Sequence, residues 1–336
     1  MLYPLKFRDV YKDYLWGGRT LAAIGKKLPE EGIVAESWEI SAHPNGPSIV
    51  KNGKLAGITL TQVLEQHHAE LLGQFDHEPY CSKFPLLIKF IDACDDLSVQ
   101  VHPDDEQASR LEHGELGKNE MWYIVAAHTD SRLIIGTHNG IDREAFAQAV
   151  ADDNISSCLR EIAVKPGDII DIPAGLLHAI GKGIVICEIQ QNSDTTYRVY
   201  DYDRRDAKGN TRPLHIDKAL EVINFSLGDS VIKQPTLRYS GDSSSDLIEL
   251  LVLNEYFEVE RWTVSTEIKC QDELNRFSTL TVLEGAGHIV WSQDDQEQYL
   301  EIIQGESVLM PALINNWKIE GDLVLLKASL PVYNGN

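Results

Sequence analysis

The chain has 336 residues, of which 43% are hydrophobic and 24% are charged, a balance typical of a globular protein with a sizeable core. Its formal net charge of -22 argues against nucleic acid and anionic membrane surfaces as partners, because binding there needs basic patches. The sequence shows no leader-like N-terminus and no apolar run approaching ~18 residues, so we expect neither a signal peptide nor a membrane span.

Four short helices are predicted in the first two thirds of the chain. The first covers residues 59–73, where Thr59 and Gln62 are spaced as a capping box and Gly73 is a stop signal. The other three are predicted at residues 104–114, 142–150 and 217–223.

Most of the remaining chain has the pattern of β-strands. Runs of β-branched and aromatic residues, bounded by Gly, Pro and Asp, lie at residues 85–93, 120–127, 132–136, 167–175 and 183–191. After a polar loop at residues 240–246 the chain becomes almost purely strand-like. We therefore predict two domains, 1–240 and 241–336, and many short antiparallel strands favour barrels or sandwiches in each.

The stretch "GDIIDIPAGLLH" resembles the second sequence motif of the cupin family, whose members are small jelly-roll barrels that hold a metal ion. The match consists of Gly167, Pro173, Gly175 and His178, and it departs after the histidine, where Lys182 takes the usual asparagine position. In that motif the histidine points into the barrel as a metal ligand.

A partial echo of this motif occurs near the C-terminus. Gly305 and Pro311 are kept, but Leu313 replaces the second glycine and Asn316 replaces the histidine. The predicted fold is therefore mainly β, with two cupin-like jelly-roll barrels, short helices in and around the first, and no metal in the second.

The stretch "LSVQVHPDD" alternates in polarity with the period of a strand. Gln100 and His102 share one face, and Val99 and Val101 share the other. If the polar pair faces inward it needs a partner, because an unpaired buried amide or imidazole costs about 1–3 kcal/mol.

The first cupin motif normally supplies two histidines in an H-x-H step and then a glutamate. Here that step is Gln100 and His102, and Glu120 is the candidate glutamate. Together with His178 they form a set of two imidazoles, one carboxylate and one amide, which suits zinc or a neighbouring divalent metal. Gln100 has an alternative role as a hydrogen-bonded neighbour of the metal rather than a ligand.

Several longer motifs then point to one family. The stretches "YLWGG", "AESWEISAHPNGPS", "LSVQVHPDD", "GKNEMWYI" and "PAGLLHAIGKGIVICEIQQNSDTTYRVYDYDR" resemble the type I mannose-6-phosphate isomerases of the shorter bacterial kind over residues 3 to 230, and more weakly beyond. The resemblance implies a zinc-dependent aldose–ketose isomerisation between mannose 6-phosphate and fructose 6-phosphate. It maps the zinc ligands, one ion per chain, onto Gln100, His102, Glu120 and His178, and an active-site arginine onto Arg198.

Such a substrate carries a phosphate, so an acidic protein needs a local island of positive charge. Lys89 is flanked by apolar residues, Lys118 lies two residues before Glu120, and Arg198 follows the 183–191 strand. With the metal, these three side chains form the predicted island.

Each of these cations also has a purely structural interpretation. Lys89 is also consistent with an edge-strand gatekeeper or a salt bridge to Asp92. Arg198 is also consistent with an ion pair to Asp201 or Asp203.

The chemistry needs a polarised carbonyl and a base that moves a proton between adjacent carbons, through an enediol. Glu188 and Asp194 are the candidate bases, the sequence does not choose between them, and a histidine or lysine next to the ligands is a further alternative. We assign Arg198, Lys118 and Glu188 as catalytic and Lys89 and Asp194 as substrate-binding.

Two other functions fit parts of the pattern. A cupin dioxygenase also uses two histidines and a glutamate, with iron(II), and a non-catalytic sugar-phosphate-binding cupin needs no full ligand set. The five cysteines are scattered without a CxxC pair, which is typical of reduced thiols and predicts a cytoplasmic protein. The family resemblance implies that its partner is a small phosphosugar.

Overall fold

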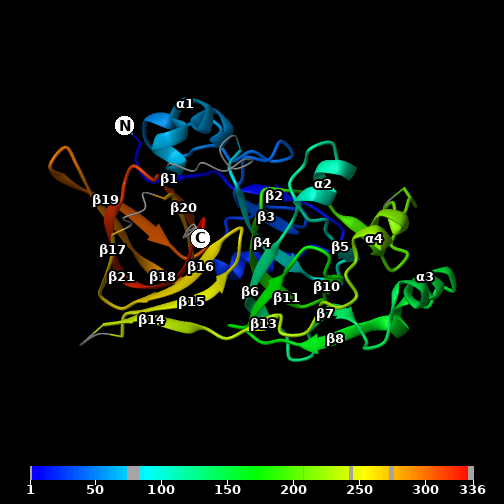
Figure 1. The fold of residues 1–336 in the computed structure, drawn as a ribbon. Helices are drawn as coiled ribbons and strands as arrows, with labels where there is room; N and C mark the ends of the chain where they lie inside the picture. The colour runs from blue at the N-terminus through cyan, green and yellow to red at the C-terminus, as the bar shows by residue number, and fades with distance from the viewer. Residues whose placement is uncertain (1, 74–82, 207, 242–244, 272–275, 332–336) are drawn as a thin grey trace, which may run out of the picture.

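The computed structural model describes residues 2–73, 83–206, 208–241, 245–271 and 276–331. This part of the chain is mainly β, as predicted, with its strands in three antiparallel sheets (Figure 1). The arrangement as two jelly-roll barrels and the division of the chain at residue 240 stay predictions.

The four predicted helices are confirmed. A capping box at Thr59 begins the first helix, and the side chains of Asp104 and Asp142 cap the second and third. Their bounds are α1 Leu60–Leu72, α2 Asp105–Leu111, α3 Arg143–Ala151 and α4 Ile216–Val222. The described residues also form three short 3-10 helices, η1 Thr20–Ile24, η2 Gly53–Leu55 and η3 Ile155–Cys158.

Two of the sheets face each other in the first part of the chain. The seven-stranded sheet has the order β13 (Ile232–Lys233), β9 (Ile169–Ile172), β6 (Glu120–Ala127), β11 (Ile184–Gln191), β4 (Leu86–Ala93), β3 (Glu36–Ile40) and β2 (Val10–Lys12). The five-stranded sheet has the order β12 (Tyr197–Tyr200), β5 (Val99–Val101), β10 (His178–Ile180), β7 (Arg132–Thr137) and β8 (Leu159–Ala163). An apolar core that includes Trp122, Ile135 and Ile180 joins their facing sides.

The third sheet has nine strands and holds the C-terminal part of the chain. Its path runs β1 (Leu5–Lys6), β20 (Ser307–Met310), β18 (Ser278–Gln293), β21 (Asn316–Ser329), β16 (Glu258–Val264), β15 (Leu247–Leu253) and β14 (Thr236–Ser240), with β17 (Glu267–Gln271) on β21 and β19 (Gln296–Ile303) on β18. It encloses its own core, in which Trp262 and Trp317 stack with ring centroids 5.7 Å apart.

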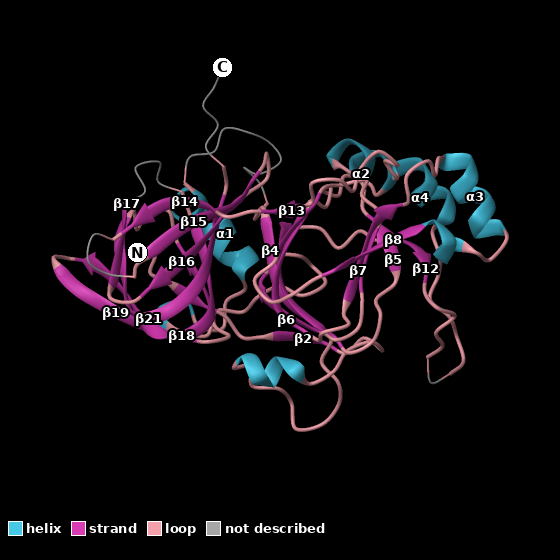
Figure 2. Cartoon of the chain, turned by 90° about the horizontal axis from the view of Figure 1, so that it is seen from below, coloured by secondary structure: helices cyan, strands magenta, loops and turns pink. Residues whose placement is uncertain are grey.

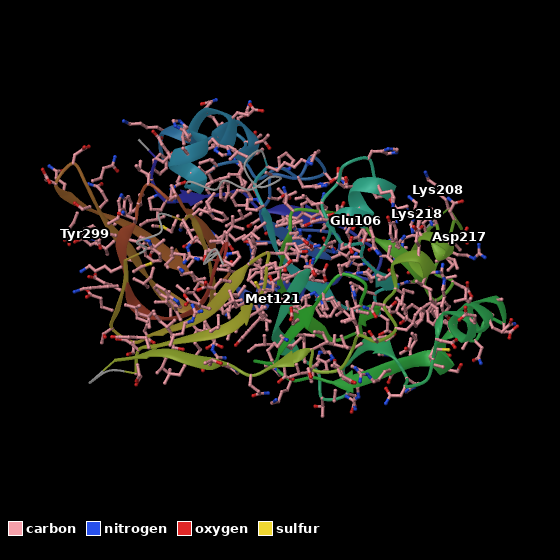
Figure 3. The ribbon with its side chains drawn as sticks, in the orientation of Figure 1. Glu106, Met121, Lys208, Asp217, Lys218 and Tyr299 are labelled. Carbon is pink, nitrogen blue, oxygen red and sulfur yellow. The ribbon has the colours of Figure 1, made fainter. Side chains whose placement is uncertain are left out.

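The layers follow from the alternation along each strand. Met121, at the centre of the molecule (Figure 3), points away from the five-stranded sheet and into the core between the seven- and nine-stranded sheets. Val99 and Val101 pack against α3 and α4, which cover the outer side of the five-stranded sheet (Figure 2). Their neighbours Gln100 and His102 are left to the inner side, where the two sheets face each other.

No helix in the described ranges is long and apolar enough to cross a membrane. Cys158, Cys187 and Cys270 are buried free thiols, and Cys94 is exposed. Cys81 lies outside the described residues.

Candidate active site

Two rows of side chains project between the facing sheets. On the five-stranded sheet, Arg198, Gln100 and His178 are directly opposite one another on β12, β5 and β10. On the seven-stranded sheet, Lys89 and Glu188 are opposite each other on β4 and β11. Because residues directly opposite in an antiparallel pair share a face, both rows point into the space between the sheets.

The three predicted ligands with ionisable side chains form one buried cluster. The ligand atoms of His102, Glu120 and His178 all lie within 4.8 Å of one another, and each residue is at most 1% exposed. His102 Nε2 is 3.3 Å from Glu120 Oε1, and His178 Nε2 is 3.9 Å from Glu120 Oε2. Gln100 reaches the same cluster, since its amide nitrogen is 3.4 Å from His178 Nε2.

Backbone carbonyls set the tautomer of both histidines. His102 Nδ1 is 2.8 Å from the Thr195 carbonyl oxygen, and His178 Nδ1 is 2.8 Å from the Leu176 carbonyl oxygen. Each Nδ1 therefore donates its proton to a carbonyl, and each Nε2 keeps a lone pair directed at Glu120. Burial lowers the pKa of both rings, that of His178 to about 3, so both stay neutral near pH 7.

Glu120 is held as a carboxylate inside the protein. Burial alone would raise its pKa, but the charge of Lys118, together with the adjacent His102, outweighs burial and holds the pKa well below the usual range. Lys118 forms an ion pair with Glu120 Oε1, and its ammonium is 3.2 Å from His102 Nε2. Trp122 Nε1 donates to Glu120 Oε2 at 3.1 Å.

These residues fit a divalent metal ion. Two imidazole lone pairs and a carboxylate converge at a buried point, each with a hydrogen-bonding partner that fixes its orientation. The Gln100 side chain lies beside these three, with its amide nitrogen 3.4 Å from His178 Nε2. Among the described residues, this is the one group of three His, Cys, Asp or Glu side chains close enough to hold an ion.

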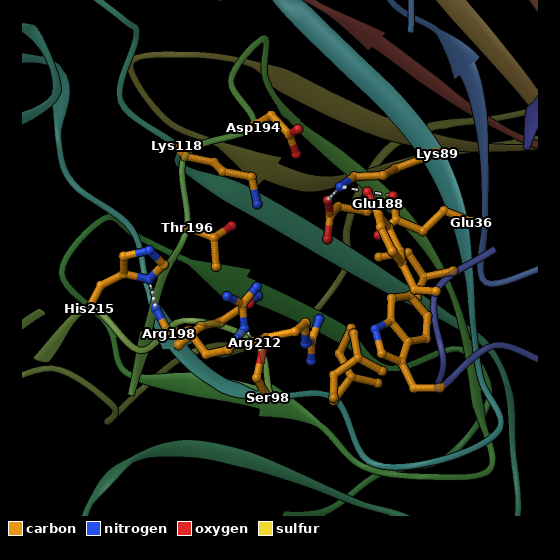
Figure 4. Close-up of a pocket in the computed structure, with 16 residues that line it drawn as sticks. Glu36, Lys89, Ser98, Lys118, Glu188, Asp194, Thr196, Arg198, Arg212 and His215 are labelled. Carbon is orange, nitrogen blue, oxygen red and sulfur yellow. Dashed lines mark hydrogen bonds and ion pairs between the residues drawn. The ribbon is translucent and has the colours of Figure 1, made fainter. Parts of the chain in front are cut away.

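A cavity of about 320 Å³ opens beside the cluster (Figure 4). This volume lies at the lower end of the range of roughly 300–1,000 Å³ that is usual for small-molecule sites. Gln100 and Lys118 separate the cavity from the buried ligands, and Lys89, Glu188, Asp194 and Arg198 also line it. The structure thus brings all nine predicted site residues to the cavity or to the cluster directly behind it.

Lys89 does not form the salt bridge with Asp92 that the structural interpretation predicts. It pairs with Glu188 Oε1 at 2.9 Å and with Glu36 Oε2 at 3.8 Å. Asp92, the alternative partner, instead accepts a hydrogen bond from the Thr20 backbone N–H at 2.6 Å. The proposed Lys89–Asp92 salt bridge is therefore absent from the described contacts.

The Lys89–Glu188 pair is fully buried at the wall of the cavity. Burial lowers the pKa of Lys89, but Glu188 and Glu36 outweigh it and raise the pKa above the usual value. Burial, followed by the charge of Glu120, raises the pKa of Glu188. Trp122 Nε1 donates to Glu188 Oε2 at 2.9 Å, so this carboxylate is oriented from two sides.

Arg198 projects into the cavity without a carboxylate partner among the described residues. Its Nε donates to Ser98 Oγ at 3.2 Å, and its NH1 donates to the Pro213 carbonyl oxygen at 3.1 Å. Asp201, the first alternative partner, is taken by Arg204 and Arg212. Burial and the neighbouring Arg212 charge lower the pKa of Arg198. The structural interpretation of Arg198 is therefore wrong for Asp201, and the contacts of the described residues include none between Arg198 and Asp203.

Asp194 lies at the opposite side of the cavity from the arginines (Figure 4). It is half-buried and accepts a hydrogen bond from Asn45 Nδ2 at 2.9 Å. No cation among the described residues pairs with it, in contrast to Glu188.

Sequence reasoning missed Arg212, which lies beside Arg198 at the cavity wall (Figure 4). Arg212 Nε donates to Asp201 Oδ2 at 2.8 Å, and this pairing fixes the direction of its side chain. The basic stretch "DRRDAKGNTR" contains several exposed charges, and nothing in it marks one arginine as special. Tyr14, Trp16 and Glu36 also line the cavity and were not predicted.

Comparisons with known proteins identify the family to which the chain belongs. A family model described as the catalytic domain of type I phosphomannose isomerase matches residues 4–138, and the cupin domain model of mannose-6-phosphate isomerase matches residues 248–329. The chain is 40% identical to mannose-6-phosphate isomerase ManA of Bacillus subtilis over 95% of this chain and 96% of that protein. It is also 40% identical to mannose-6-phosphate isomerase of Streptococcus mutans over 97% of this chain and 98% of that one.

The fold is shared with a solved relative. The crystal structure of mannose 6-phosphate isomerase from Bacillus subtilis superposes with a TM-score of 0.87 at 35% identity, covering 97% of this chain and 99% of that one. Identity of this extent over nearly the whole length leaves one assignment: the chain belongs to the family of type I mannose-6-phosphate isomerases.

Proposed function

We propose that the protein is a zinc-dependent isomerase that interconverts mannose 6-phosphate and fructose 6-phosphate through an enediol. One observation carries the proposal: a buried His–Glu–His cluster lies beside a cavity that is lined by Gln100 and Lys118, which contact the cluster, and by two arginines. A small phosphosugar with one end at the cluster and its phosphate at the arginines fits this arrangement of charges.

The metal would be held by His102, Glu120 and His178, with Gln100 as the fourth ligand. Zinc suits this mixed nitrogen and oxygen set, and one ion per chain is expected. When bound, the ion supplies Lewis-acid polarisation of the sugar carbonyl, which makes the adjacent C–H acidic.

Proton transfer then falls to the carboxylates at the cavity wall. We assign Glu188 as the catalytic base, because burial raises its pKa and two donors, Lys89 and Trp122, fix its orientation. Lys89 keeps a positive charge beside the base. Asp194, at the open side of the cavity, binds substrate hydroxyls.

Lys118 is the cation that both lines the cavity and contacts the ligand cluster. Its ammonium is therefore in place to donate a hydrogen bond to the sugar oxygens at the reacting carbons. A charge-assisted bond there strengthens as negative charge develops on oxygen in the enediol. We assign Lys118 a catalytic role on this basis.

The two arginines divide the anionic end of the substrate. Arg198 is opposite Gln100 in the β5–β12 register, which places it nearer the reacting carbons. Arg212 is held by Asp201 and presents the rest of its guanidinium to the phosphate. Together they supply positive charge that a phosphate needs in a protein of net charge -22.

The proposal also covers the domains, the partner and the cellular location. We propose that residues 1–240 form the catalytic domain and residues 241–336 a second, cupin-like domain without a metal. The partner is the phosphosugar alone, and the location we expect is the cytoplasm.

A coupled assay with mannose 6-phosphate, run before and after chelation, tests the proposal. We expect turnover that is lost on chelation and restored by zinc, with little activity on unphosphorylated mannose. Oxygen consumption with an iron-loaded protein would favour the dioxygenase alternative. Tight sugar-phosphate binding without turnover would favour the sensor alternative.

A further inference from the structure

A pair of side-chain amides, Asn119 and Gln191, lies buried behind the cavity. Asn119 is 8% exposed and Gln191 is fully buried. Gln191 Oε1 accepts hydrogen bonds from the Asn119 backbone N–H at 2.9 Å and from Asn119 Nδ2 at 2.8 Å. The Gln191 backbone N–H donates in return to the Asn119 carbonyl oxygen at 3.1 Å. We call these two residues the amide clasp.

The amide clasp ties two further segments to the same point. Asn119 Oδ1 accepts a hydrogen bond from the Ala174 backbone N–H at 2.9 Å. Gln191 Nε2 donates to Asp105 Oδ1 at 3.0 Å, and that oxygen also accepts from the Gly117 backbone N–H at 2.7 Å. Four stretches of chain that are distant in sequence therefore meet at two side chains.

Each tied segment carries part of the active site. Asn119 lies between Lys118 and Glu120, and Asp105 comes three residues after His102. Ala174 comes two residues before Leu176, whose carbonyl orients His178. Gln191 comes four residues before Thr195, whose carbonyl orients His102. Asp194 lies on the last of these segments. The distances between the reacting groups thus depend on this one network.

The amide clasp acts from outside the cavity. Neither Asn119 nor Gln191 lines the cavity, and neither contacts the side chains of the ligand cluster in any hydrogen bond of the described residues. Asn119 and Glu120 are adjacent, so their side chains point to opposite sides of the chain. Any effect of the amide clasp on catalysis must therefore pass through the residues that it positions.

We propose that the amide clasp is a positioning pair that sets Lys118 and Glu120 against the loop bearing Asp194 and Thr195. Hydrogen bonds of buried amides have no water to replace them, so losing one lets the tied segments shift. Shifts of about 1 Å at groups that orient reacting atoms cost on the order of 10²-fold in rate. The kinetic part of this proposal rests on the proposed function, whereas its effect on metal binding does not.

The test uses two clasp variants, Asn119→Ala and Gln191→Met, the second of which keeps most of the side-chain volume. Both are compared with the control Asn52→Ala. Asn52 is a half-buried amide in another part of the chain, where Oδ1 accepts from the Lys6 N–H at 2.9 Å and Nδ2 donates to the Pro4 carbonyl at 3.0 Å. Each variant is measured for kcat and KM at saturating zinc, for the zinc dissociation constant by competition with a chelator, and for Tm.

We expect both clasp variants to lose about 10–100-fold in kcat and to bind zinc about tenfold more weakly, with KM changed less than about threefold. The double variant should lose no more than the worse single variant, because either change opens the same network. Asn52→Ala should lower Tm and leave kcat and zinc affinity unchanged.

Clasp variants that lose only Tm, as the control does, would overturn the proposal and leave the network a purely structural one. If Asn119→Ala does not fold, Gln191→Met decides by the same criteria. If the unaltered protein shows no isomerase turnover, the proposed function fails by itself. The zinc dissociation constants then decide on the amide clasp, and unchanged constants reject it.

Discussion

The same turn occurs twice in this protein, and the two copies have different surroundings. Just before β9, Gly167 adopts a left-handed backbone, and after β9 the chain brings His178, fully buried at the start of β10, into the ligand cluster. Just before β20, Gly305 also adopts a left-handed backbone, but the corresponding Asn316 is exposed at the start of β21.

The second half of the turn explains the difference. Gly175 has φ = +82°, a region that disfavours L side chains, whereas Leu313 at the matching position is not left-handed. The interiors differ as well, because stacked Trp262 and Trp317 fill the nine-stranded sheet where the first part has a cavity. The strand ends of the first part thus carry a candidate site, whereas the nine-stranded sheet encloses a packed core.

The largest effect should come from replacing the candidate ligand His178, with its counterpart Asn316 as the control. His178→Ala removes one imidazole from the cluster and should abolish zinc binding and lower kcat by at least about 10³-fold, because Lewis-acid catalysis supplies several kcal/mol. Asn316→Ala, at the equivalent position of the second turn, should change neither. Zinc content by atomic absorption and the coupled assay measure both, and a loss in Asn316→Ala would assign the second turn a role in the site.

Arg198→Ala should be the next most severe change. An arginine repels a cation and cannot be a ligand, so zinc should stay bound while kcat falls by about 10²–10³-fold, as for loss of an oxyanion donor. Steady-state kinetics with zinc analysis of the same sample checks this. Unchanged kcat and KM with full zinc would remove Arg198 from the active site.

Arg212→Ala should raise KM rather than lower kcat. If Arg212 contacts the phosphate equally in the ground state and in the transition state, its loss raises KM by about tenfold, equivalent to ~1.4 kcal/mol, and leaves kcat nearly intact. The matched control is Arg205→Ala, because Arg205 donates to the Gly209 carbonyl on the exposed part of the same loop. Equal KM values for the two variants would exclude a phosphate contact by Arg212.

The smallest effect on turnover should follow the replacement of a large core residue in the nine-stranded sheet. Trp317→Ala opens a cavity in the core of the nine-stranded sheet and should lower the free energy of unfolding by about 3–5 kcal/mol, with kcat unchanged. Trp122→Ala should lower both, because Trp122 donates to Glu120 and Glu188. Denaturant unfolding alongside kinetics separates the two, and a fall in kcat for Trp317→Ala would couple the regions.

Local signals made part of this molecule predictable. The capping residues Thr59, Asp104 and Asp142 mark helix starts within a few positions, and the alternation of Gln100 with Val99 places these two side chains on opposite faces of the strand. The spacing from Gly167 to His178 pointed to a candidate ligand for the same reason, since the segment between them is local, and His178 lies in the buried cluster.

Pairings between distant segments were not predictable in this way. The Lys89–Glu188 ion pair depends on the register of β4 with β11, which no short stretch specifies. Arg212 reaches the cavity because a loop folds back onto Asp201, and Asn119 meets Gln191 only once β6 and β11 have paired. Such contacts follow from the tertiary structure, so a single sequence offers no signal for them.

Titration of the metal-stripped protein with zinc tests the central claim most directly. Isomerase activity on mannose 6-phosphate should rise in proportion to added zinc and level off at one ion per chain, and His178→Ala should show no such rise. Full activity in the stripped protein, or a plateau that requires two ions per chain, would contradict a single catalytic zinc at His102, Glu120 and His178.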